Sequence, residues 1–494
     1  MTPTLTHSAL TVPGPKPKLG SLLSTYQFAK DSVGYTRRLF DTYGPIVALV
    51  AGGGTRLYSP YPTCPGTVFA CGPTLTRQVT TQHNIFHKCP LTGPLYRLRS
   101  RSKRTQPLNH FLVGLFGVNE NKHLQQRKLM MPAFHRQQLE TYATDMVAIT
   151  QSELSQLSTG NTYDIAALMR QITLRIATKS LFGEDIGSKS GSTGEIIHKA
   201  LRLQSHPLMR LMRYDIPGLP WHQFLSLAAQ YETVMYNIIE TKRQAQQQNS
   251  AAAPDVLSML MQVQDEETQA GLTAEELLGH VGVLFVAGHE TSANALTWTL
   301  FLLSQHPHIL RDVLDELTAV LSGKAPTLDQ LKHLPLLERV IKESMRVLPP
   351  VPWNGRVTTQ PVELGGHLLP AYTEVLVSIY QTHHMGELYP SPESFDPSRW
   401  ETITPDSYTY NPFSAGPRMC IGAGFAMLEI KIILAILLQR YRLEFVPAHP
   451  VDRSGVIVMA PKRGLLMKLH DQDREFEKGV GTVSGNVREM VTLP

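Results

Sequence analysis

The chain has 494 residues, about three times the length of a typical ~150-residue domain, so a large buried core is possible and a small disulfide-stapled scaffold is excluded. Charged residues make up 18% and apolar residues 42%, a balance that indicates a globular protein and excludes wholesale disorder. The net charge of +5 is too small to indicate a nucleic-acid partner, and none is expected.

Cysteine usage and the first residues suggest the compartment. Cys64, Cys71, Cys89 and Cys420 are too few and too unevenly spaced for a disulfide framework, which favours a reducing cytoplasm. Residues 1–20 contain neither a signal-peptide core nor an apolar run long enough to span a membrane. We therefore expect a cytoplasmic protein without a transmembrane anchor.

The first hundred residues and the last hundred and fifty predict short strands, and the middle predicts helices. Strand-like runs enclose a helical region from about 124 to 303, and one more helix is expected at 424–441. The expected strands are 46–50, 67–69, 374–379, 456–459 and 464–469. No internal repeat or low-complexity linker is present. The fold class predicted is mainly α with a small β region, in a single unit.

The first candidate site in chain order is a basic helical face. His123 and Arg127 are four residues apart, a spacing that lets two donors meet adjacent carboxylates. A solvated basic face is the alternative interpretation. The basic run 97–104 before it is expected to be a solvated loop, with anchoring of a substrate carboxylate as a weaker hypothesis.

The long helix has an unusual centre. A capping box, Thr273 with Glu276, marks its start, and Pro307 marks its end. Gly288 in the middle costs about 1 kcal/mol relative to Ala, and close passage over a flat ligand would explain it. Thr291 can hydrogen-bond to the carbonyl four residues earlier and bend the helix. A kink without a proton-transfer role is the alternative.

Two further motifs follow. Glu343 and Arg346 share one face of a helix predicted to begin near Pro335 and to end before Pro349, and taken alone they describe an ordinary ion pair. Cys420 stands between glycines immediately before a helix, where amide dipoles and Arg418 favour the thiolate, the form that binds metal. A lone cysteine is more commonly a buried small hydrophobe, so the surrounding loop decides.

The segment 413–422 resembles the haem-binding loop F-x-x-G-x-R-x-C-x-G of the cytochrome P450 family at every fixed position. Residues 287–291 resemble that family's A-G-x-[DE]-T, and 397–400 its P-x-R-[FW]. His123 replaces the Trp of the family's W-x-x-x-R, and residues 383–386 keep only the first position of H-R-D-P. The resemblance extends over about residues 13–470.

The resemblance implies a cytochrome P450 fold as residues 21–470, one haem-containing unit, with residues 1–20 as an N-terminal extension and 471–494 as a flexible C-terminal tail. It implies haem b (iron protoporphyrin IX) with Cys420 as axial thiolate and Glu290 and Thr291 passing protons to dioxygen. Glu343, Arg346 and Arg399 would form a structural network. The implied haem-binding residues are His123, Arg127, Ala287, Gly288, Arg356, Phe413, Gly416, Arg418 and Gly422.

The resemblance leaves the substrate to variable segments, whose residues are mostly apolar. The expected lining is Phe111, Leu112, Leu284, Phe285, Val351, Trp353 and Ile457, although several of these could simply fill the core. We expect a monooxygenase acting on an apolar substrate such as a fatty acid or a terpenoid. Alternatives are a haem-thiolate peroxygenase or isomerase, and a haem sensor without catalysis.

A chain of this length leaves no room for a fused reductase. Electrons are therefore expected from a separate ferredoxin- or flavodoxin-like donor with its own reductase. That donor would meet basic residues near the thiolate side, such as Lys128, Arg136 and Lys431.

Overall fold

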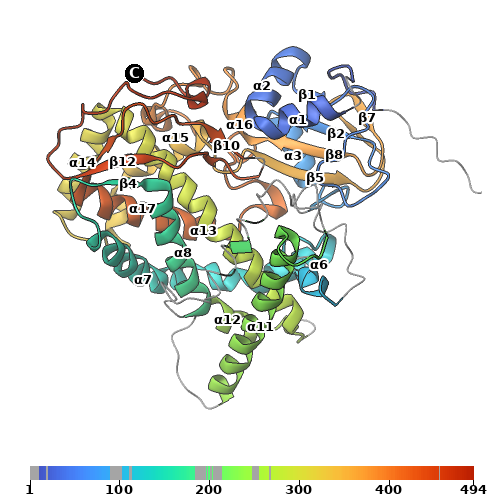
Figure 1. Ribbon diagram of the computed structural model, residues 1–494, viewed down its shortest axis with the longest axis horizontal. Helices are drawn as coiled ribbons and strands as arrows, with labels where there is room; N and C mark the ends of the chain where they lie inside the picture. The colour runs from blue at the N-terminus through green and yellow to red at the C-terminus, as the bar shows by residue number, and fades with distance from the viewer. Residues whose placement is uncertain are drawn as a thin grey trace, which may run out of the picture. The chain divides into compact units, whose positions relative to one another are not determined.

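The structure of the protein is a computed structural model. It describes residues 10–17, 21–89, 103–110, 114–183, 196, 199–200, 203, 214–247, 255–265, 269–455 and 457–494. The chain forms two compact units (Figure 1). Unit 1 comprises residues 1–91, 146–172 and 290–494, and unit 2 comprises 92–145 and 173–289.

Helices dominate the described residues. They are α1 (Leu22–Lys30), α2 (Ser32–Tyr43), α3 (Pro73–Thr81), α6 (Glu120–Met130), α7 (Arg136–Ser155), α8 (Ile165–Phe182), α11 (Pro220–Gln247), α12 (Val256–Gln262), α13 (Ala274–Gln305), α14 (Pro307–Leu321), α15 (Pro335–Val347), α16 (Ile379–His383) and α17 (Ala423–Arg440). Short 3-10 turns are η1 (Gln106–Asn109), η2 (Met131–Phe134), η3 (Gln330–His333), η4 (Pro397–Glu401), η5 (Gly416–Arg418) and η6 (Asn486–Glu489).

The strands gather in unit 1. They are β1 (Ile46–Ala48), β2 (Thr67–Ala70), β3 (Phe86–His87), β4 (Thr162–Asp164), β5 (Trp353–Thr358), β6 (Val362–Leu364), β7 (His367–Leu369), β8 (Glu374–Ser378), β9 (Tyr441–Phe445), β10 (Arg453–Ser454), β11 (Ala460–Pro461) and β12 (Leu466–Asp471). The largest sheet has the order β1-β2-β8-β5-β3, in which only β2 and β8 run parallel. Smaller sheets are β4-β12-β9, β6-β7 and β10-β11.

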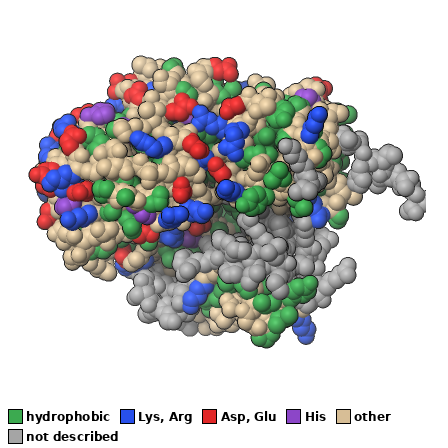
Figure 2. Space-filling model, turned by 45° about the horizontal axis from the view of Figure 1, so that its top comes forward, with side chains coloured by type: hydrophobic (Ala, Val, Ile, Leu, Met, Phe, Trp, Pro, Cys, Tyr) green, Lys and Arg blue, Asp and Glu red, His purple; other side chains and the backbone are tan. Residues whose placement is uncertain are grey.

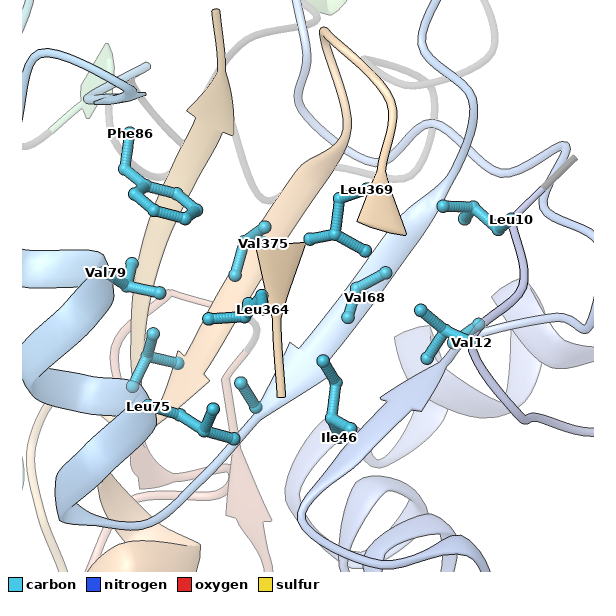
Figure 3. Close-up of a cluster of buried hydrophobic side chains, with 13 residues drawn as sticks. Leu10, Val12, Ile46, Val68, Leu75, Val79, Phe86, Leu364, Leu369 and Val375 are labelled. Atoms are coloured by element: carbon cyan, nitrogen blue, oxygen red, sulfur yellow. The ribbon is translucent and has the colours of Figure 1, made fainter. Parts of the chain in front are cut away.

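One face of the five-stranded sheet carries a hydrophobic core. Leu75 and Val79 of α3 point toward the sheet, and Leu364 and Leu369 of the β6-β7 hairpin lie over the sheet near Val375 (Figure 3). All five side chains are buried. Because α3 is anchored here, its last turn has a fixed place beside the Cys420 loop described below.

A buried carboxylate attaches the loop at residues 57–59 to the five-stranded sheet. Glu374 of β8 accepts hydrogen bonds from the backbone N–H groups of Leu57 (2.8 Å) and Tyr58 (2.6 Å), from the N–H of Ser59, and from the hydroxyl of Thr67. Burial raises the pKa of Glu374, and these donors oppose the rise. The bonds offset the cost of burying a carboxyl group, and the Tyr58 hydroxyl, which donates to the Arg356 carbonyl at 2.6 Å, also holds the loop.

Unit 2 is helical among its described residues. Leu108, Trp221, Phe224, Leu225 and Ala228 form a buried cluster in which α11 covers η1. Trp221 and Phe224 stack with ring centroids 5.8 Å apart. The α11 helix therefore packs on the segment that leads towards α6.

The C-terminal segment, residues 471–494, was expected to be a flexible tail. In the structure it lies on unit 1, and five of its apolar side chains are buried. They are Phe476, Val483, Val487, Met490 and Val491. The sequence pattern misled because apolar residues spaced among glycines do not form a periodic element.

Most predicted elements are found within a few residues of their expected bounds. The Thr273–Glu276 capping box forms reciprocally, with the Glu276 N–H donating to the Thr273 hydroxyl at 3.2 Å. The strand expected at 456–459 is not found at its described residues 457–459, which lie between the two-residue strands β10 and β11. Among the described residues, no helix is long and apolar enough to cross a membrane. Acidic and basic side chains are interspersed on the face shown in Figure 2.

Candidate functional site

The loop that carries Cys420 is closed by its own backbone. The Cys420 N–H donates to the Phe413 carbonyl at 2.8 Å, and the Met419 N–H donates to the Gly416 carbonyl at 3.0 Å. Cys420 is exposed, and α17 begins three residues later with Gly422 at its N-cap. Cys420 is therefore accessible close to a helix N-terminus, where the helix dipole favours a negative charge.

Neighbouring elements fix this loop from two sides. Gly416 has φ +68°, and a Cβ added there would lie 2.8 Å from the Thr80 carbonyl oxygen at the end of α3, so only glycine fits. Asn354 of β5 donates to the hydroxyl of Ser414 at 3.0 Å, and Ser414 itself has φ +64°. The sheet and α3 thus support the loop.

A cluster of cations lies in the same unit. Desolvation by burial lowers the pKa of Lys88 well below its usual value, and the charges of Arg356 and Arg418 lower it further. Burial also lowers the pKa of Arg356, to about 10. Arg356 is 2% exposed, whereas Lys88 and Arg418 are partly exposed, and an anionic ligand beside these like charges would reduce their mutual repulsion. The two propionates of haem suit this cluster, and the exposed Cys420 suits its iron, so the residues present fit the group.

Lys88 was not among the residues predicted from the sequence. It follows Phe86–His87, a two-residue strand that pairs with β5 at Thr358 and Val357. The pairing brings Lys88 near Arg356, which is 268 positions away. This proximity could have been predicted only from the register in which β3 pairs with β5.

One face of α13 differs from the rest of the helix. Leu284, Ala287, Gly288 and Thr291 recur at helical spacing and keep partial exposure. Phe285, between them on another face, is fully buried and packs on Phe182. The predicted motif therefore lies on a face that protein side chains do not fully cover. Glu290 is also partly exposed.

The predicted basic face lies in unit 2. His123 is 2% exposed and Arg127 is half-buried, one turn apart on α6. The exposed-face interpretation is thus wrong for His123. The neighbouring Gln126 donates to Glu276 of α13 at 2.9 Å, which fixes the rotation of α6 within the unit.

Glu343, Arg346 and Arg399 form one buried network. Arg346 binds both carboxylate oxygens of Glu343 at 2.8 and 2.9 Å, and Arg399 Nε donates to Glu343 at 2.8 Å. Trp400 Nε1 donates to the same carboxylate at 3.0 Å. Arg346 also donates to the carbonyls of Pro392 and Ser394, so the network fastens the irregular chain that precedes the Cys420 loop.

His383, the one residue retained from the H-R-D-P pattern, is neutral. Burial lowers its pKa to about 3, and the positive charge of Arg346 contributes. The Asn411 N–H donates to His383 Nε2 at 3.1 Å, which requires an unprotonated nitrogen there.

The predicted pocket residues divide into three groups. Leu284 and Val351 are partly exposed and Ile457 is exposed, so core packing does not account for these three. Trp353 is 1% exposed and packs against Phe28 and Phe69, with centroids 6.3 and 5.7 Å away, and Phe285 is fully buried, so core packing accounts for both rings. Phe111 and Leu112 lie outside the described residues.

The structure changes two predictions about basic side chains. Lys431 is 13% exposed and donates to Glu338 at 2.7 Å, so it is unavailable to an electron donor, whereas Lys128 and Arg136 are exposed. Arg104, the last residue of the basic run, binds Asp215 through two nitrogens at 3.1 and 3.2 Å. It therefore has a partner in unit 2, and residues 97–102 are not described.

Comparisons with known proteins agree with this geometry. The chain matches the family described as Cytochrome P450 over residues 11–467. It is 32% identical to cyclooctat-9-en-7-ol 5-monooxygenase of Streptomyces melanosporofaciens, over 76% of this chain and 80% of that protein. It is 29% identical to pentalenene oxygenase of Streptomyces avermitilis, over 94% of this chain and 98% of that protein.

A solved structure is similar along nearly the whole chain. It is described as retinoic acid bound cyanobacterial CYP120A1, and it matches with a TM-score of 0.75 and 26% identity over 94% of this chain and all of that one. With the family match and the Cys420 loop already described, the assignment follows: the chain belongs to the cytochrome P450 family and has that family's mainly α fold.

Proposed function

We propose that this protein is a haem-thiolate monooxygenase that inserts one atom of dioxygen into an apolar terpenoid. The observation that carries the proposal is the exposed Cys420 just before α17, in a backbone-closed loop, in the same unit as the cations Lys88, Arg356 and Arg418. Bound haem b supplies the redox chemistry that activates dioxygen.

The residues of this chain take distinct roles in the proposal. Cys420 would provide the thiolate that ligates the haem iron, and the cation cluster would hold the propionates, with His123 and Arg127 of α6 as further contacts. Phe413, Gly416 and Gly422 shape the loop. On α13, Ala287 and Gly288 allow close approach to the ring, and Glu290 and Thr291 hold and pass protons.

A terpenoid is favoured over a fatty acid by two observations. The relatives named for a substrate include oxygenases of cyclooctat-9-en-7-ol and pentalenene. Arg104, the last residue of the basic run, already binds Asp215, which weakens it as a carboxylate anchor. The lining proposed is Leu284, Val351 and Ile457, with Phe111 and Leu112 added from the sequence.

Electrons would come from a ferredoxin- or flavodoxin-like protein with its reductase. Lys128 and Arg136 are exposed and could meet an acidic donor. The rate of reduction should then fall as salt rises, because screening weakens such an encounter.

The test is a pair of spectra and one turnover assay. The purified protein, reduced under carbon monoxide, should show the absorption characteristic of a thiolate-ligated haem. Titration with pentalenene, retinoic acid and palmitic acid should then shift the iron spin state for the terpenoids first. Absence of haem would refute the proposal, and a response to palmitic acid alone would refute the terpenoid class.

Turnover separates the alternatives. Product that forms with surrogate ferredoxin, reductase and NADPH supports a monooxygenase. Product that forms only with added peroxide indicates a peroxygenase, and tight haem binding without any product indicates a sensor.

A further inference from the structure

The C-terminal segment is hydrogen-bonded to the β10-β11 hairpin. The proposed pocket residue Ile457 lies between the two strands of this hairpin. The Arg453 N–H at the start of the hairpin donates to the Asn486 side chain at 2.8 Å. The Asn486 N–H donates to the Asp452 side chain at 3.0 Å, so each segment donates a backbone N–H to a side chain of the other. A parallel bridge between Pro450 and Ser484 extends the contact.

Arg453 is the centre of this contact. Its guanidinium is 3% exposed, and it donates to Asp31, the N-cap of α2, at 2.7 Å and to Glu489 at 2.6 Å. It also donates to the Asn486 carbonyl. Burial disfavours the charged form, but the hydrogen bonds to the two carboxylates raise the pKa of Arg453. Because the buried guanidinium is hydrogen-bonded to two carboxylates, it restricts the position of the Arg453 backbone.

Residue Met459 of the hairpin is hydrogen-bonded to two elements that carry residues of the proposed pocket. The Met459 N–H donates at 2.7 Å to the carbonyl of Pro350, next to Val351. Trp298 of α13, two turns beyond Thr291, donates from Nε1 to the Met459 carbonyl at 3.0 Å. One short hairpin thus connects the C-terminal segment with two elements of the proposed site.

Close packing limits how the segment can sit. Gly485 has φ +103°, and a Cβ added there would lie 2.5 Å from the Val451 carbonyl oxygen. Any larger residue must push the segment off the hairpin. Gly481 has φ +76° in the same segment, but its Cβ would meet only the Pro494 carbonyl oxygen at 3.7 Å and carbon at 3.9 Å. Both glycines have a positive φ, but only the Cβ added at Gly485 would collide with the chain that leads into the hairpin.

We propose that residues 484–489 are a positioning brace, which sets the place of the β10-β11 hairpin and thereby the substrate selectivity of the enzyme. These residues lie beyond the family match, which ends at residue 467. The inference rests on the proposed function for its selectivity readout, whereas the brace itself can be tested without substrate.

The experiment compares Gly485→Ala with Gly481→Ala, and Glu489→Gln with Glu477→Gln, in the full holoprotein. Glu477 belongs to the same segment but pairs with the exposed Arg311 instead of Arg453. Gly485→Ala should weaken pentalenene or retinoic acid binding about three- to tenfold and change the product ratio, with Glu489→Gln smaller in the same direction. Both controls should match the wild type, and the carbon monoxide spectrum should be retained.

Hydrogen exchange of the peptide around 450–461 supplies a readout free of substrate. Faster exchange in Gly485→Ala and Glu489→Gln than in their controls is expected. Unchanged exchange and unchanged selectivity in both variants would overturn the brace. If Gly485→Ala does not fold, Glu489→Gln decides. A wild type that binds none of the probes refutes the terpenoid proposal, while the exchange result still decides the brace.

Discussion

The Cys420 loop and the β10-β11 hairpin are both short and irregular, yet they are held in different ways. The Cys420 loop closes on itself through backbone hydrogen bonds and requires a glycine where α3 approaches. The hairpin depends on Arg453 and its partners Asp31 and Glu489, which are 422 and 36 positions away respectively. A site shared by a family can thus be encoded locally, whereas a segment proposed to select the substrate is placed by distant side chains.

The largest effect is expected from Cys420→Ala, which tests the Cys420 loop. Without the proposed ligand, the reduced carbon monoxide complex should lose its thiolate signature and product formation should cease. Because the loop closes through backbone groups, the free energy of unfolding should change little. A Cys420→Ala protein that keeps the thiolate spectrum would show that another cysteine is the ligand.

The next effect concerns the network that leads into the loop. Glu343→Gln leaves Arg346 and Arg399 buried without their carboxylate and should lower the free energy of unfolding by about 3–5 kcal/mol. Denaturant titration measures it. Asp329→Asn, which breaks the exposed pair with Lys332, should cost less than about 1 kcal/mol. Equal losses in the two variants would contradict the importance of burial.

Thr291 lies on the helix that also binds the hairpin through Trp298. Thr291→Ala should reduce product per NADPH consumed about tenfold and release peroxide instead, because proton delivery is lost. Thr291→Ser should recover most of the coupling. Simultaneous measurement of NADPH, product and peroxide distinguishes this from weaker binding, and full coupling in Thr291→Ala would remove Thr291 from the proton path.

The smallest effect is a pH dependence of stability. His383 has a folded pKa of about 3, so it contributes stability above its unfolded pKa that is lost as pH falls. Between pH 7 and 6 the loss should be about 0.7 kcal/mol, given an unfolded pKa of ~6.5. His383→Asn should flatten the thermal midpoint against pH more than His333→Asn, which changes an exposed histidine. Identical slopes would contradict the assignment.

The sequence predicted features that depend on neighbouring residues better than features that depend on distant ones. The α13 and α15 bounds, the capping box and the Cys420 loop depend on neighbours within a few residues, so patterns revealed them. Lys88 required knowledge of strand register, and the burial of Trp353 required the positions of Phe28 and Phe69. Lys431 was predicted to contact the electron donor because its partner Glu338 lies 93 positions away and could not be inferred from the neighbouring sequence.

The order of strands in the main sheet has a consequence for synthesis. Strand β2 pairs with β8, so residues 67–70 cannot complete their ladder until residue 377 has been made. At about 5–20 residues per second, the ribosome needs about 15–60 s for that stretch. The nascent N-terminal strands must wait for that time with one edge open, a period in which chaperones would guard them against pairing with other chains.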